Sequence, residues 1–153
     1  MKKVALIVAG GSGSRMASST PKQFLLLKNT PILMHTIRQF SSFDKIIVVL
    51  PATKINLWKK LCEKTEFPLK HVLIKGGTNR FESVKNGLAN ITEQSIVAIH
   101  DGVRPLVSKN LIDRLIQEVK DGVGAVPILP ITSSVLEINH TNLKHIDRSN
   151  LYK

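Results

Sequence analysis

The chain has 153 residues, 42% of them hydrophobic and 22% charged, which predicts one domain with its own core and leaves no apolar run long enough to cross a bilayer. Its single cysteine, Cys62, excludes an internal disulfide and favours a reducing cytoplasm. The net charge of +11 indicates anionic partners, but dispersed lysines and only 5% aromatic residues argue against nucleic acid and favour small phosphorylated ligands.

Short β-branched runs alternate with segments of helical periodicity along the chain. VALIVA (4–9) predicts a buried strand, which is followed by a glycine bend, a short extended FLLL piece and a helix from Pro31 to about Phe40. The further expected elements are strand 45–50, helix 54–65, strand 71–74, helix 79–89, strand 95–100, a helix from the N-cap Ser108 to about Val119, strand 124–129, and an extended pair at 134–138 and 143–147. Apolar strands separated by helices indicate an α/β fold: a Rossmann-like, mostly parallel sheet with helices on both faces.

Three segments that follow predicted strands share an unusual composition. AGGSGSRM, KGGTNR and HDGVRP each contain glycine and arginine. In open parallel sheets, ligands bind beyond the carboxyl ends of the strands, which is where these segments fall. We therefore expect all three loops to contribute to one site.

The first loop resembles a phosphate cradle without matching the best-known templates, because both the dinucleotide fingerprint and the Walker loop need glycine where this chain has other residues. Gly10, Gly11 and Gly13 allow main-chain N–H groups to approach an anion closely. Arg15 offers a planar fork to phosphate oxygens, and Lys22 follows a rigid proline that folds it back over the same phosphates. The alternative is a plain turn between a strand and a helix with two surface cations.

The second loop opens with Gly76 and Gly77, which leave room for a planar base against the backbone. Thr78 is expected to cap the next helix, and Ser83 lies one turn further on, facing the same way as Arg80. A capped helix without a ligand is the alternative interpretation.

The third loop places Asp101 directly after a buried strand, where a carboxylate can hold Mg²⁺ together with substrate phosphates. Arg104 either pairs with Asp101 or reaches an anionic substrate, and a local salt bridge is the simpler alternative. We expect His100 to be a partly buried, hydrogen-bonded histidine, Trp58 to pack in the core and Cys62 to be structural; no residues have zinc-site spacing. Cations, a magnesium carboxylate and a gap the size of a base suit nucleotidyl transfer.

VAGGSGSRM and PKQFL resemble the signature of sugar-nucleotidyltransferase-like enzymes. With GGTNRFESVKNGL, HDGVRPLVS and HIDRSNLY, the whole chain is similar to the 2-C-methyl-D-erythritol 4-phosphate cytidylyltransferase family. The resemblance implies transfer of CMP from CTP to methylerythritol phosphate, with release of pyrophosphate, in non-mevalonate isoprenoid biosynthesis in the bacterial cytoplasm. It also implies Mg²⁺ or another divalent cation as cofactor and a homodimer when the protein is complete.

The resemblance also implies roles for particular residues. The loop around the CTP phosphates corresponds to Ala9, Gly10, Gly11 and Gly13. The pair that stabilises the pentacoordinate α-phosphate corresponds to Arg15 and Lys22. The contacts to cytosine and ribose correspond to Gly77, Thr78 and Ser83, and the metal-site carboxylate corresponds to Asp101.

On the acceptor side, Arg148 matches the arginine that positions methylerythritol phosphate, usually across a dimer interface. Gly102 and Arg104 belong to the Asp101 motif, and Ser134 keeps a hydroxyl next to Ser133, which stands where the family usually has a carboxylate. Members of the family are usually longer, so we expect this chain to be a nucleotidyltransferase domain over 1–153 that lacks the family's C-terminal part. The alternatives are a ribitol-5-phosphate cytidylyltransferase, a nucleotidyltransferase for another base, and an inactive fragment that binds CTP.

Overall fold

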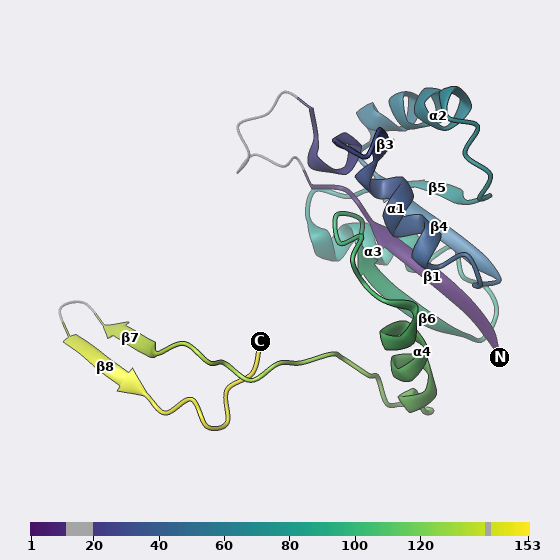
Figure 1. The fold of residues 1–153 in the computed structure, drawn as a ribbon. Helices are drawn as coiled ribbons and strands as arrows, with labels where there is room; N and C mark the ends of the chain where they lie inside the picture. The colour runs from purple at the N-terminus through teal and green to yellow at the C-terminus, as the bar shows by residue number, and fades with distance from the viewer. Residues whose placement is uncertain (12–19, 140–141) are drawn as a thin grey trace. The chain divides into compact units, whose positions relative to one another are not determined.

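The computed structural model describes residues 1–11, 20–139 and 142–153, and contains two compact units, residues 1–116 and 117–153. The elements of the chain, shown in Figure 1, are β1 (Lys2–Val8), η2 (Lys22–Phe24), β2 (Leu26–Leu27), β3 (Thr30–Pro31), α1 (Ile32–Gln39), β4 (Lys45–Leu50), η3 (Ala52–Lys54), α2 (Ile55–Lys64), β5 (Val72–Lys75), α3 (Arg80–Leu88), β6 (Ser95–Asp101), α4 (Lys109–Glu118), β7 (Val135–Asn139) and β8 (Asn142–Ile146).

Four parallel strands form the central sheet in the order β5-β4-β1-β6. The chain moves outward from β1 through β4 to β5, then crosses back to place β6 on the other side of β1 (Figure 1). The direction of winding therefore reverses between β1 and β6. At such a switch point the loops leave in opposite directions and open a crevice at the carboxyl ends, so the topology confirms the expected α/β fold and locates its ligand-binding edge.

Both faces of the sheet are apolar, as the unbroken hydrophobic runs predict. On one face, Ala5 and Ile7 of β1 pack with residues of α1 and with Trp58 of α2 and Ile112 of α4. On the other face, a smaller cluster around Leu6 packs against α3. Gly87 permits this approach, because a Cβ added there would lie 2.3 Å from Cδ1 of Leu6.

The helices begin where local sequence signals place them, with one correction. Ser108 caps α4 as expected, since its hydroxyl accepts the N–H of Leu111 at 3.2 Å. At α3 the expected cap, Thr78, is wrong: Asn79 accepts the N–H of Glu82 at 2.9 Å. The Glu82 carboxylate reaches back to the N–H of Thr78 at 2.7 Å. Together these two hydrogen bonds satisfy otherwise unpaired donors at the start of the helix.

In the second unit, β7 and β8 form an antiparallel pair with Val135 opposite Ile146, which confirms the expected extended pair. The expected strand at 124–129 is wrong, because the structure describes these residues and assigns them no strand. In the described part of the chain, this run finds main-chain partners only at its end, where Leu129 and Lys153 exchange two hydrogen bonds of 2.8 and 2.9 Å. A β-branched run becomes a strand only where a neighbour can pair with its backbone.

Across the residues that the structure describes, no helix has both the length and the apolar character needed to cross a membrane.

Candidate active site

The first two glycine loops meet at the hydroxyl of Ser83, which is buried with 3% exposure. Its Oγ donates to the carbonyl of Asn79 at 2.9 Å and accepts the N–H of Gly77 at 3.1 Å. A Cβ added at Gly10 or Gly76 would lie 3.3 or 3.1 Å from the same oxygen. The residues predicted to surround the nucleotide from β1 and from β5 are therefore brought together.

Gly77 has a structural reason to be glycine in addition to the role expected from the sequence. A Cβ at this position would lie 2.2 Å from the Cβ of Glu82, which must fold back to reach the main chain and hydroxyl of Thr78 at 2.7 and 2.8 Å. These hydrogen bonds lower the pKa of Glu82. The hydrogen bonds at the start of α3 therefore explain why residue 77 is glycine. From the sequence, this glycine was expected only to leave room for a base. Gly11 differs, because among the described residues a Cβ there would meet no atom within 4 Å.

Lys22 opens the η2 turn and is partly exposed, beside a residue that the sequence analysis missed. The side chain of Gln23 is buried and its Nε2 donates to the carbonyl of Ala9 at 2.9 Å and to that of Gly11 at 3.5 Å. The structure thus joins the Lys22 turn to the start of the first loop. Gly13 and Arg15 lie outside the described residues.

Asp101 ends β6 with its carboxylate between two arginines. Nη2 of Arg80 lies 3.1 Å from one oxygen and Nε of Arg104 lies 2.9 Å from the other. Burial raises the pKa of Asp101, but the hydrogen bonds from Arg104 and Arg80, together with their charges, outweigh burial and leave the pKa below its ordinary value. The contact with Arg104 was one of two alternatives in the sequence, whereas the contact with Arg80, from a helix 21 residues earlier, was not foreseen.

Asp101 fits a cation site in which one carboxylate shares the ion with substrate phosphates. Among residues 1–11, 20–139 and 142–153 there is no group of three or more histidine, cysteine or acidic side chains placed to share a metal. Mg²⁺ does not need such a group, since one or two carboxylates and substrate phosphates suffice. Asp101 therefore fits a magnesium ion held jointly with a triphosphate.

His100 and Gly102 flank Asp101 and hold the end of β6 in place. Nε2 of His100 is 3.0 Å from the carbonyl of Arg104, and burial lowers the pKa of the ring, in keeping with the expected hydrogen-bonded histidine. The N–H of Gly102 donates to Val8 at 2.8 Å, and a Cβ there would come within 2.7 Å of that of Ala9. Gly102 therefore lets the third loop lie directly against the first.

Two of the residues expected on the acceptor side, Arg148 and Ser134, lie in the second unit. The guanidinium of Arg148 donates to the carbonyl of Thr132, two residues before the exposed Ser134. Within this unit, the segments that flank β7 and β8 thus bring Arg148 close to the segment that carries Ser134.

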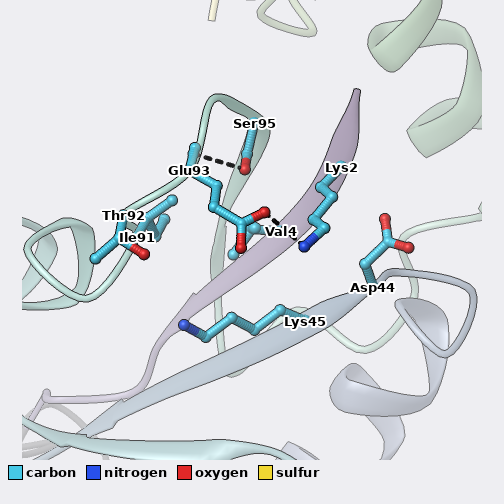
Figure 2. A pocket seen from close by; sticks show the side chains of 8 residues that line it. All are labelled: Lys2, Val4, Asp44, Lys45, Ile91, Thr92, Glu93 and Ser95. Carbon is cyan, nitrogen blue, oxygen red and sulfur yellow. Dashed lines mark hydrogen bonds and ion pairs between the residues drawn. The ribbon is translucent and has the colours of Figure 1, made fainter.

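A pocket of about 400 Å³ lies at the amino ends of β1, β4 and β6, whereas the glycine loops follow the carboxyl ends of the strands. Figure 2 shows the side chains that line this pocket. Its lining residues are Lys2, Val4, Asp44, Lys45, Ile91, Thr92, Glu93 and Ser95. Lys2 pairs with Glu93 at 2.5 Å, and Lys45 donates to the carbonyl of Asn90 at 2.8 Å. Asp44 and Glu93 balance the charges of the two lysines, so the lining has no net positive charge to attract a phosphorylated ligand.

The sheet is open and parallel, and its winding reverses beside β1. Glycine loops lie at the carboxyl ends of its strands, with a lysine and a carboxylate beside them. These features define an α/β protein of the nucleotidyltransferase class. The model of the 2-C-methyl-D-erythritol 4-phosphate cytidylyltransferase family matches residues 3–153. The chain belongs to this family.

Individual relatives agree with this assignment. The protein of that name from Azobacteroides pseudotrichonymphae is 46% identical over 99% of this chain and 69% of its own length. The bifunctional IspDF structure from Campylobacter jejuni superposes with a TM-score of 0.81 at 30% identity, over 100% of this chain and 39% of that one. A ribitol-5-phosphate cytidylyltransferase from Vibrio parahaemolyticus is 41% identical over 95% of this chain and 66% of its own length.

Proposed function

We propose that the protein transfers CMP from CTP to 2-C-methyl-D-erythritol 4-phosphate and releases pyrophosphate, in the cytoplasm, as a step of isoprenoid biosynthesis. Family membership supports the reaction. The structural observation that carries the proposal is the junction of the two glycine loops at Ser83, with the Lys22 turn tied to the same loop by Gln23.

In this proposal the nucleotide lies along the carboxyl edge of β1. Gly77, Thr78 and Ser83 contact cytosine and ribose, and the N–H groups of the first loop, including Gly10 and Gly11, receive the phosphates. A phosphate oxygen of the acceptor attacks the α-phosphorus, and the bond to the β-phosphate oxygen breaks, so that pyrophosphate leaves with the electron pair. Lys22 and Arg15 stabilise the negative charge that develops on the α-phosphate oxygens.

Asp101 would hold a divalent cation, Mg²⁺ in the simplest case, jointly with the triphosphate. When bound, the ion neutralises charge on the phosphates. The chain's own contribution is to keep the carboxylate ionised and oriented, which Arg80 and Arg104 do by hydrogen bonding both of its oxygens.

Arg148, Ser134, Arg104 and Gly102 are proposed to receive the acceptor phosphate and polyol. Because one molecule's Arg148 would serve its partner's site, a homodimer is part of the proposal. The proximity of Arg148 to the segment before Ser134 supports treating them as one acceptor-binding group.

Ribitol 5-phosphate is the second candidate acceptor, favoured by the 41% identity to the Vibrio protein. Release of pyrophosphate should be measured with CTP and Mg²⁺ and with each acceptor in turn, then with UTP or GTP in place of CTP. Turnover confined to CTP and methylerythritol phosphate supports the proposal. Turnover with ribitol 5-phosphate alone would mean that ribitol 5-phosphate is the acceptor. A preference for another nucleotide would overturn the assignment of cytosine as the base. Binding of CTP without any turnover would mean that the protein binds CTP but is not an enzyme.

A further inference from the structure

Gln23 is an uncommon residue to find in the interior, because its amide is polar and only 2% of the residue is exposed. Its Nε2 is directed at two carbonyl groups of the first loop, at 2.9 Å to Ala9 and 3.5 Å to Gly11. These contacts span 14 and 12 residues of sequence. The side chain therefore joins two segments that face the proposed triphosphate site.

The turn that carries Gln23 is anchored on its other side as well. Phe24 is buried and stacks on Trp58, with ring centroids 6.0 Å apart and planes inclined by 21°. The turn itself is closed by hydrogen bonds from Phe24 to Pro21 at 2.9 Å and from Leu25 to Lys22 at 3.1 Å. With Gln23 and Phe24 both fixed, the main chain of Lys22 has little freedom to move away from the first loop.

The Gln23 amide also orients the loop backbone. In a trans peptide the C=O and N–H groups point in opposite directions. Since the Ala9 carbonyl is directed at Gln23, the N–H of Gly10 in the same peptide unit points away from it. The Gln23 amide also holds the carbonyl oxygens of Ala9 and Gly11 towards itself. These oxygens are thereby kept from facing the proposed triphosphate, which they would repel.

We infer that Gln23 is a positioning residue for nucleotidyl transfer: its amide fixes the Ala9–Gly11 backbone against the Lys22 turn, so that main-chain N–H groups and the Lys22 ammonium act on the same triphosphate. The inference rests on the proposed function and adds a residue whose effect passes through Lys22 and the loop. Gln23 itself does not touch the nucleotide in this scheme.

The test is a double-mutant cycle between Gln23 and Lys22. Gln23→Met keeps the length of the side chain and removes the donor, and Gln23→Glu keeps the shape and replaces the donor by an acceptor. Both are compared with the exposed control Gln117→Ala. The kcat of pyrophosphate release and the dissociation constant of CTP, from calorimetry, are measured in the wild-type and Lys22→Ala backgrounds, with thermal unfolding followed in parallel.

We expect Gln23→Met to lower kcat by about tenfold or more and to weaken CTP binding severalfold in the wild-type background, with Gln23→Glu worse and Gln117→Ala unchanged. In the Lys22→Ala background the same change should lower kcat by less than about threefold, because the Lys22 ammonium is gone and only the smaller contribution through the loop N–H groups remains. An equal loss in both backgrounds, or an unaffected Gln23→Met variant, would overturn the inference. If Gln23→Met unfolds below the assay temperature, Gln23→Glu is judged by the same cycle.

The two proposals fail in different ways. If Lys22→Ala itself turns over CTP at a normal rate, the assignment of Lys22 in the proposed function is wrong. If Lys22→Ala is impaired and the Gln23 effect is independent of it, only the inference about Gln23 is wrong.

Discussion

The guanidinium of Arg80 donates to one carboxylate oxygen of Asp101 across 3.1 Å, while Arg104 occupies the other oxygen at 2.9 Å. Both arginines come from segments at the carboxyl edge of the sheet, one before β6 and one after it. A cation that binds Asp101 must therefore share or displace an existing hydrogen bond. The proposed Mg²⁺ dependence can therefore be tested at a single carboxylate.

Asp101→Asn should mainly change the response to magnesium. The amide keeps the size of the side chain but removes the charge that attracts the cation, so we expect the Mg²⁺ concentration at half-maximal rate to rise by about tenfold or more. The measurement is a magnesium titration of pyrophosphate release at saturating CTP. Asp113→Asn, on the exposed side of α4, is the matched control. An unaltered titration curve for Asp101→Asn would remove this residue from the metal site.

Lys22→Ala and Arg15→Ala should each lower kcat by at least ~10², the range observed when one donor to transition-state charge is lost. Neither change should unfold the protein, and Lys64→Ala, in the exposed last turn of α2, should leave turnover unchanged. Steady-state kinetics with CTP and the preferred acceptor give the comparison. Near-normal kcat in both variants would mean that the first loop is only a turn.

Folding stability should decrease on acidification because of two partly buried histidines, His71 and His100. The indole N–H of Trp58 can only donate, so Nε2 of His71 accepts it at 2.8 Å, and Nδ1–H donates to the carbonyl of Leu69 at 2.8 Å. This arrangement requires the neutral ring. Burial lowers the pKa of His71, and likewise that of His100, from the ordinary 6.5.

The sign of the effect follows from proton uptake. Near pH 6 the unfolded chain binds more protons at these histidines than the folded one. Their contribution to the free energy of unfolding is therefore fully present above pH 6.5 and is lost as the pH falls through that value towards the lower folded pKa values. Denaturant unfolding between pH 7.5 and 5 measures this slope. His71→Gln, whose amide oxygen can accept from Trp58 without titrating, should flatten it. A slope that is steeper in the variant, or stability that rises on acidification, would contradict the assignment.

Gly87→Ala should destabilise the protein although alanine favours helices. The new methyl group would lie 2.3 Å from Cδ1 of Leu6, a fully buried side chain of β1, so α3 or the sheet must shift, at a cost of roughly 1–3 kcal/mol. Gly124→Ala is the matched control, because a Cβ there meets nothing within 4 Å. Thermal or urea unfolding of the two variants checks the difference. Equal stability would show that the α3 contact can relax freely.

The central sheet could be predicted from the sequence because its strands are continuous apolar runs, and each expected strand from VALIVA to SIVAIH is present within a residue or two at either end. The run at 124–129 is also mostly apolar, but it contains Gly124 and Pro127 and is not a strand, because in the described part of the chain no neighbouring strand pairs with it. The candidate site likewise combines features that the sequence could predict with features that it could not. Loop positions could be inferred from strand order, whereas the contacts of Gln23 and Arg80 join segments more than ten residues apart and leave no local signal.

One hydroxyl, that of Ser83, borders Gly10, Gly76 and Gly77 at once. A bulkier side chain at this position would press on both loops together, so under the proposed function a change in the nucleobase contacts made here would also disturb the contacts to the phosphates. Under the proposed function, evolution of this scaffold towards a different nucleoside triphosphate is therefore expected to proceed through exposed loop residues such as Gly11 and Thr78, leaving the serine in place.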